Sequence, residues 1–256
     1  MQHIIAKSTL LRISGVLLAL FGTLSVASRD FAFQWQPVPE DIPGREGLAQ
    51  AIGVLEILVG LAVLVPRWRQ RASLALMIVF SGWALLHLPA IAKQPLAVSA
   101  WLGAAEISAL ALGALLMTHL QARQTLVIRF YGVTLLVFGL SHFVYAEFTA
   151  ALVPTWLPAP LFLAYLTGAI HLAAGIGLVV NFAPRIAAAL EACMMLSFVV
   201  LLHMPRVLAT PQNRTEWTML LVASALTCSA FQVATSARAS EDETEVQRDV
   251  KALQTS

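Results

Sequence analysis

The sequence predicts an all-α fold, a polytopic transmembrane helical bundle of eight helices arranged as two parallel four-helix repeats. Three observations predict it. Of the 256 residues, 59% are hydrophobic and 12% are charged, about half the charge of a soluble domain. Long apolar segments carry no charge, and the chain repeats itself once at a spacing of about 117 residues. This composition excludes a soluble globular enzyme and a disordered chain, and a net charge of +2 excludes a nucleic-acid reader.

The apolar segments have the length of membrane-spanning helices. About 20 apolar residues cross the hydrocarbon core of a bilayer, and no Asp, Glu, Lys or Arg lies between Arg71 and Lys93 or between Glu216 and Arg238. Helices are expected because backbone groups in lipid must be satisfied within the segment. The predicted spans are residues 10–28, 47–66, 72–91, 101–119, 126–146, 161–183, 186–204 and 217–236.

The first span follows a basic N-terminal segment and has the features of a signal peptide with a cleavage site at residues 25–27. The corresponding fifth span lies in mid-chain, where no signal peptide can stand, so a membrane helix is expected for both. The third and seventh spans end in His-Leu-Pro and His-Met-Pro, where proline ends or kinks the helix. The fourth and eighth spans open at Trp101 and Trp217, as interfacial aromatics do.

The second half repeats the first in order. Arg12-Ile-Ser-Gly15 corresponds to Arg129-Phe-Tyr-Gly132, and Leu-Leu-His-Leu-Pro89 corresponds to Leu-Leu-His-Met-Pro205. An even number of spans in each unit predicts a parallel repeat about an axis near the membrane normal. The predicted units are residues 1–120 and 121–237, followed by a polar acidic cytoplasmic tail, residues 238–256. With the N-terminus in the cytoplasm, eleven Lys and Arg lie inside and five outside, so both termini are expected there.

Three segments of the second half carry a family resemblance: Gly139-Leu-Ser-His142-Phe, Val153-Pro-Thr-Trp-Leu-Pro158 and Thr167-Gly-Ala-Ile-His171. They resemble the DoxX-like family of bacterial integral membrane proteins, and the whole chain resembles a fused tandem duplication of its four-helix unit. The resemblance implies the bacterial cytoplasmic (inner) membrane. It also implies a loose link to quinones, since the family is named for a subunit linked to thiosulfate:quinone oxidoreduction, and relatives are associated with oxidative-stress complexes. The chain departs from the family pattern at His171, where Glu is more usual.

Two ionisable residues are expected near the middle of the membrane. Glu56 and His171 occupy equivalent positions of the second and sixth spans. Each has a glycine three residues before it and four after it, on the same helix face, so a neighbouring helix can approach closely. Facing repeats would allow Glu56 to meet His171, either as a proton-handling or ligand-binding pair or as interhelical glue. The predicted helix-packing glycines are Gly53, Gly60, Gly168 and Gly175.

Three further histidines are expected at the outer ends of their spans: His87, His203 and His142. His87 and His203 each precede a proline by two residues and are predicted to cap a freed carbonyl. An outward-facing pocket and haem ligation are the alternatives, and haem is not favoured. The most specific site hypothesis is one cavity that holds all three histidines, with Glu56 and His171 beneath them. Glu106 and Glu191 are interpreted as buried hydrogen-bonded groups or protonated acids.

Several chemical signatures are missing from the sequence. It has no Cys-x-x-Cys, no phosphate loop and no metal-ligand spacing within a span, so no metal and no intrinsic cofactor are predicted. The first functional hypothesis is a non-catalytic membrane module or assembly subunit. The alternatives are a quinone-linked redox subunit and a carrier of a small lipid-like or protonatable solute. The lipid bilayer is the expected partner, and a soluble or membrane-bound redox partner and a homo-oligomer remain partner hypotheses.

Overall fold

The computed structural model describes residues 2–32, 34–118 and 123–255, and the regular structure within them is helical, with no strand. Eight helices of this described part are long and apolar enough to cross a membrane, which confirms the eight predicted spans. The first four spans are α1 (Gln2–Ser28), α2 (Arg45–Leu64), α3 (Arg69–Leu85) with its short continuation α4 (Leu88–Lys93), and α5 (Val98–Leu116). The others are α6 (Gln124–Val144), α8 (Pro160–Val179), α9 (Pro184–Phe198) with its continuations, and α11 (Arg214–Thr255).

Prolines set the interruptions in the third and seventh spans. Pro89 separates α3 from α4, as the sequence predicts. Near Pro205 the seventh span passes through a π-helical turn, η1 (Val199–His203), before it continues as α10 (Met204–Ala209). A π-helical turn is rare and frequently marks a functional site. The short helix α7 (Ala146–Leu152) and a proline-rich connection precede α8.

Glycines bring two helix pairs into close contact. A Cβ on Gly53 of α2 would lie 2.7 Å from the carbonyl oxygen of Gly22 in α1. A Cβ on Gly175 of α8 would lie 2.8 Å from the carbonyl oxygen of Gly132 in α6. Gly60 and Gly168 have the same kind of neighbour, so all four predicted packing glycines lie at helix contacts.

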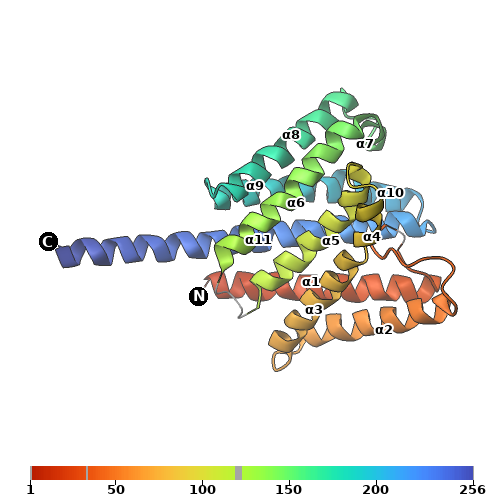
Figure 1. The fold of residues 1–256 in the computed structure, drawn as a ribbon, viewed down its shortest axis with the longest axis horizontal. Coiled ribbons are helices and arrows are strands. Elements are labelled where there is room, and N and C mark those ends of the chain that lie inside the picture. Colours follow the sequence, from red (N-terminus) through yellow and green to blue (C-terminus); the bar gives the residue numbers. More distant parts are fainter. Residues whose placement is uncertain (1, 33, 119–122, 256) are drawn as a thin grey trace.

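The two halves interlock through α5 and α11, which run through the middle of the bundle (Figure 1). Helix α11 packs on α9 of its own half and on α1 of the other, while α5 packs on α3 and on α6. The two central helices also contact each other, where the Oγ of Ser229 donates a hydrogen bond to the carbonyl of Ala109 at 2.7 Å. Gly113 lies at this crossing because a larger residue would collide with Ser229.

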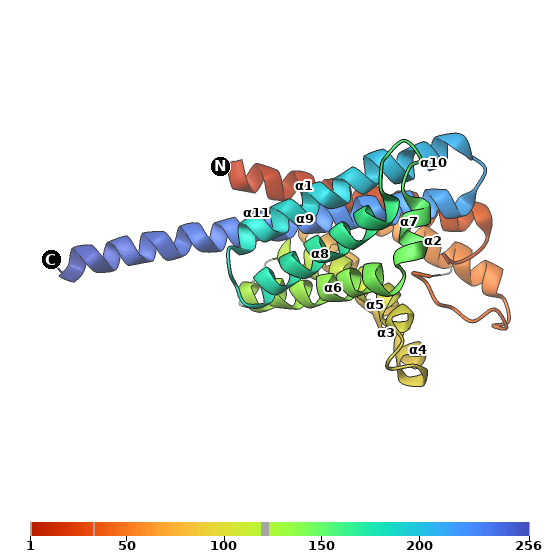
Figure 2. The ribbon, with the colours of Figure 1, turned by 90° about the horizontal axis from the view of Figure 1, so that it is seen from above.

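Both chain termini lie at one end of the bundle (Figures 1 and 2). From there α11 extends past the bundle, since the segment predicted as a polar tail continues this helix to Thr255. The opposite end carries the connection between α1 and α2, together with α4, α7 and α10. The site described next lies toward this second end.

Candidate functional site

A cavity of about 790 Å³ lies between α6, α7, α8, the η1 region, the first turns of α5 and α11, and the segment after α1. Its volume falls within the range of about 300–1,000 Å³ that is usual for ligand sites. Leucine, phenylalanine and other apolar side chains form most of the wall. The polar lining includes three histidines, two acids and an arginine: His142, His171, His203, Asp30, Glu106 and Arg214.

Two of these histidines lie together in an aromatic part of the wall. The rings of His142 and His171 are 5.0 Å apart between centroids, in an edge-to-face arrangement. Phe138 approaches His171 edge-on at 5.7 Å, and Phe198 is stacked against His142 at 6.2 Å. Phe138 of α6 and Phe198 of α9 therefore pack against the two imidazoles.

The hydrogen bonds of His142 assign its tautomer, since hydrogens themselves are inferred from partners. The hydroxyl of Thr167 donates to the carbonyl of Leu163 at 2.9 Å or of Ala164 at 3.0 Å. The oxygen of this hydroxyl lies 2.9 Å from Nδ1 of His142, which is also 3.3 Å from the Ala164 carbonyl. Both neighbours accept a hydrogen bond, so Nδ1 carries the proton and Nε2 keeps its lone pair.

His171 is oriented by an acid. Its Nδ1 lies 2.9 Å from Oε1 of Glu191, and both side chains are at most 2% exposed. The two atoms do not form a hydrogen bond, so Nδ1 of His171 and Oε1 of Glu191 are both buried without a hydrogen-bond partner. The contact places the carboxyl group of Glu191 beside Nδ1 of His171.

His203 also lines the cavity, in the π-helical turn, and its Nδ1 is buried without a hydrogen-bond partner. His87 does not line it. The His87 ring lies under α5, where a Cβ on Gly103 would be 2.5 Å from its Cε1, and its Nε2 has no partner. The His87 ring is hydrogen-bonded to the backbone of Trp35, in the connection after α1, and not to a carbonyl of its own helix freed by Pro89.

Glu56 belongs to a separate cluster in the first half. Its Oε1 accepts hydrogen bonds from Nε2 of Gln36 at 2.8 Å and from Nε1 of Trp83 at 3.0 Å. Its Oε2 is buried without a partner and the residue lines a cavity of about 30 Å³, room for roughly two water molecules. The expected meeting of Glu56 with His171 is wrong, because each has its own partner. The single cavity of five residues is also wrong, because Glu56 and His87 lie outside it.

Sequence reasoning missed the partners of these groups. Gln36 and Trp35 lie in the connection after α1, where a tryptophan and a glutamine just before Pro37 were the only signal in the sequence. Trp35 donates its indole N–H to Oε2 of Glu106 at 2.5 Å, so Glu106 is hydrogen-bonded as interpreted, although it is only half-buried in the cavity wall. Glu191 faces His171, a pairing that no local pattern contains.

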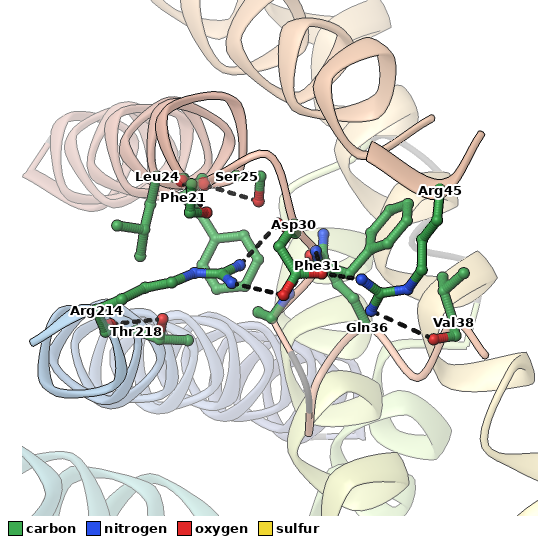
Figure 3. A network of polar contacts seen from close by, with 12 residues as sticks. Phe21, Leu24, Ser25, Asp30, Phe31, Gln36, Val38, Arg45, Arg214 and Thr218 are labelled. Carbon is green, nitrogen blue, oxygen red and sulfur yellow. Dashed lines mark hydrogen bonds and ion pairs between the residues drawn. The ribbon is translucent and has the colours of Figure 1, made fainter. Parts of the chain in front are cut away.

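Charged groups connect the chain segments at the rim of the cavity (Figure 3). Asp30 lies between Arg45 at the start of α2 and Arg214 at the start of α11. Its Oδ2 is 3.1 Å from Nη1 of Arg214, and its Oδ1 accepts hydrogen bonds from Arg45 and from the backbone N–H of Phe31. Partial burial by itself would raise the pKa of Asp30. The hydrogen bonds and the two positive charges outweigh burial and hold this pKa below its ordinary value.

The described residues offer no metal centre, since no three His, Cys, Asp or Glu side chains among them are grouped to hold an ion. The histidines considered for haem, His87 and His203, do not line a common cavity. Two imidazoles must face one iron from opposite sides to ligate haem. The arrangement therefore does not fit a bis-histidine haem.

A comparison with protein families matches residues 124–204 to the DoxX family model. This segment of the second half is therefore similar to the DoxX family. No curated protein and no solved structure matches the chain. The matched segment runs from α6 to η1 and contains His142, His171 and His203, the three histidines of the large cavity.

Proposed function

We propose that this protein is a non-catalytic membrane module whose DoxX domain binds a lipid-soluble small molecule with a polar head. The observation that carries the proposal is the cavity of about 790 Å³, with apolar walls and a few converging polar groups. Such a lining is typical of small-molecule sites. Protein interiors rarely leave voids of this size, and buried polar atoms such as Nδ1 of His203 need a partner.

A quinone-linked redox subunit is the second candidate, and the His171–Glu191 pair favours it. A buried imidazole beside a carboxyl can accept and hold a proton at the cavity wall. His142 and His171 are the residues that would hold a quinone ring, and a bound quinone would supply two-electron, two-proton chemistry. Electrons would come from a partner protein.

The test is to identify the small molecules that co-purify with the full chain in mild detergent, by mass spectrometry with an absorbance spectrum. Ala223→Phe would fill the cavity from α11, where Ala223 is buried in its wall. Ile176→Phe is the matched control, because Ile176 is 55% exposed on α8. We expect a stoichiometric molecule in the wild type and the control and its loss in Ala223→Phe. Only bulk phospholipid in all three proteins would overturn the proposal.

We also infer that the two halves are related repeats in the bacterial cytoplasmic membrane, with both termini in the cytoplasm. Equivalent glycines support the repeat, since Gly22 with Gly53 and Gly139 with Gly168 are matched contacts of the first two long helices of each half. The central crossing supports it as well, because Gly113 and Ser229 are themselves 116 positions apart. The excess of Lys and Arg on the termini side supports the orientation.

A further inference from the structure

The ion pairs at the rim of the large cavity leave one positive charge unbalanced. Asp30 lies between Arg45 and Arg214 and is bonded to both (Figure 3). One carboxylate thus serves two guanidinium groups, so this bonded cluster has a surplus of one positive charge. Glu106, the other acid of the cavity lining, accepts the indole N–H of Trp35 and forms no ion pair in the part of the chain that the structure describes. It is therefore not the counter-charge of Arg214.

Arg214 also has a guanidinium nitrogen without a partner. Its Nη1 lies 3.1 Å from Oδ2 of Asp30, and its Nη2 donates a hydrogen bond to the backbone carbonyl of Asp30 at 2.7 Å. Its Nε, by contrast, is buried without a hydrogen-bond partner, and Arg214 lines the large cavity. A buried donor without an acceptor is unfavourable, so an acceptor held in the cavity would stabilise this side chain.

A second arginine at the same end of the bundle shows which group satisfies such a nitrogen. Arg206 donates from Nε to Oε2 of Glu216 at 2.8 Å and from Nη2 to Oε1 of the same carboxylate at 2.8 Å. Two parallel bonds of this kind make the pairing of a guanidinium with a carboxylate both strong and specific. The chain supplies this carboxylate to Arg206 and supplies none to Nε of Arg214. A carboxylate from a ligand would complete Arg214 in the same way.

The length of the cavity indicates the rest of the ligand. Arg214 begins α11 and lies three residues before Trp217, an exposed aromatic residue of the kind found at the level of lipid head groups. The cavity lining on α11 continues from Arg214 to Leu226. Twelve residues of α-helix rise about 18 Å, which is close to half of the hydrocarbon thickness of about 30 Å. The mostly apolar wall is thus about as long as one lipid leaflet is thick.

We propose that the large cavity binds an anionic amphiphile with a single alkyl chain, the chemistry of a fatty acid. Its carboxylate lies on Nε of Arg214 at the rim, and its chain extends along α11 toward Leu226. This inference rests on the proposed function, because it requires a ligand in this cavity. It adds the charge of the ligand, its orientation and its single chain. The volume of about 790 Å³ is that of a site for a drug-sized ligand, which suits one alkyl chain better than the two chains of a phospholipid.

The test uses a photoreactive hexadecanoate that carries a diazirine in its chain. The full chain is labelled in phosphatidylcholine nanodiscs, in alkaline buffer that keeps the probe ionised, and mass spectrometry maps the labelled peptides. We expect labels on the segments of α6, α9 and α11 that line the cavity, and their loss in Ala223→Phe, which fills it. The competitors are hexadecanoate, hexadecanol and dipalmitoyl phosphatidylglycerol.

Loss of a hydrogen bond to a charged group weakens binding by about tenfold or more. We therefore expect hexadecanoate to compete at a concentration about tenfold lower than hexadecanol, which has the same chain length without the charge. Dipalmitoyl phosphatidylglycerol, which is anionic but has two chains, should compete no better than hexadecanol.

Three variants locate the effect at Arg214. Arg214→Gln removes the charge and Nε, so hexadecanoate should bind about tenfold or more weakly, while hexadecanol is unaffected. Asp30→Asn removes the carboxylate that competes for Arg214, so hexadecanoate should bind at least as tightly as to the wild type. Arg206→Gln is the matched control, because Arg206 is ion-paired at the same end but does not line the cavity, and it should keep the wild-type affinity. Thermal melting of each variant verifies that it folds.

The outcomes separate this inference from the proposed function. Equal competition by hexadecanoate and hexadecanol overturns the anionic head group and leaves the cavity as a ligand site. A loss of binding in Asp30→Asn as large as that in Arg214→Gln overturns the role of Arg214, because the ion pair then only holds the rim together. Competition by the two-chain lipid as strong as that by hexadecanoate overturns the single chain. Absence of labels from the cavity lining, together with co-purification of bulk phospholipid alone, overturns both proposals.

Discussion

The contact between α6 and α8 predicts a specific cost for adding one methyl group. A Cβ on Gly175 would lie 2.8 Å from the carbonyl oxygen of Gly132, 2.8 Å from Cδ2 of Leu136 and 3.1 Å from its backbone nitrogen. Two of these atoms are backbone, so the helices must move apart. Overpacking of this kind costs about 1–3 kcal/mol. Alanine also favours the helix over glycine by up to about 1 kcal/mol, which offsets part of this loss.

Gly82→Ala is the matched control, because a Cβ at Gly82 of α3 meets nothing within 4 Å. The helix preference of alanine is common to both variants, so the difference between them measures the clash alone. We expect Gly175→Ala to be less stable than Gly82→Ala by about 1–3 kcal/mol, with a Tm lower by about 2–4 °C for each kcal/mol at this chain length. Thermal unfolding in one detergent, followed by fluorescence-detected size exclusion, gives both values. Equal melting of the two variants would refute the close packing of α6 on α8.

Two further perturbations test the polar groups. The pKa of Asp30 is lower in the folded chain than in the unfolded chain, where it is about 3.9. Its carboxylate therefore stabilises the fold above the unfolded pKa, and this stabilisation is lost as the pH falls through the folded pKa. At pH 7 the wild type should therefore melt at a higher Tm than Asp30→Asn, through a stabilisation of less than about 1 kcal/mol for so exposed a group. This difference in Tm should disappear below about pH 4. A difference that persists in acid would contradict the ion pairs. Trp83→Phe removes one of the two donors to Glu56 and should lower stability by about 1–3 kcal/mol. Trp101→Phe removes an exposed indole hydrogen bond and should lower stability less. A double-mutant cycle of Trp83→Phe with Glu56→Leu, which removes the acceptor, would refute the Trp83–Glu56 contact if it showed no coupling.

The fold was predictable because each span is a local property of the sequence. A charge-free segment such as residues 72–92 has only one stable form in lipid, and Pro89 fixes where the third span is interrupted. The glycines beside Glu56 and His171 also lie where they were expected, because the spacing of small residues on one helix face is visible without a partner. The π-helical turn near Pro205 was not predictable, since proline allows several local geometries.

The site was predictable in its residue types but not in its grouping. Histidines at the ends of spans five and seven indicated a cavity there, and His142 and His203 do line a common cavity. The partners of Glu56 come from a connection 20 residues away and from another helix. No periodicity records such contacts. The sequence also did not reveal that α5 and α11 pack on helices of the opposite half. This packing keeps the second and sixth spans from meeting face to face.

The difference between Glu56 and His171 has a physical reason in their surroundings. A second carboxyl at position 171 would stand against Glu191, and two carboxylates at this distance cannot both ionise. The corresponding stretch of the first half, residues 73–75, contains no acid, so Glu56 has no such neighbour and takes neutral N–H donors instead. His171→Glu should therefore destabilise the fold far more than Glu56→Gln does.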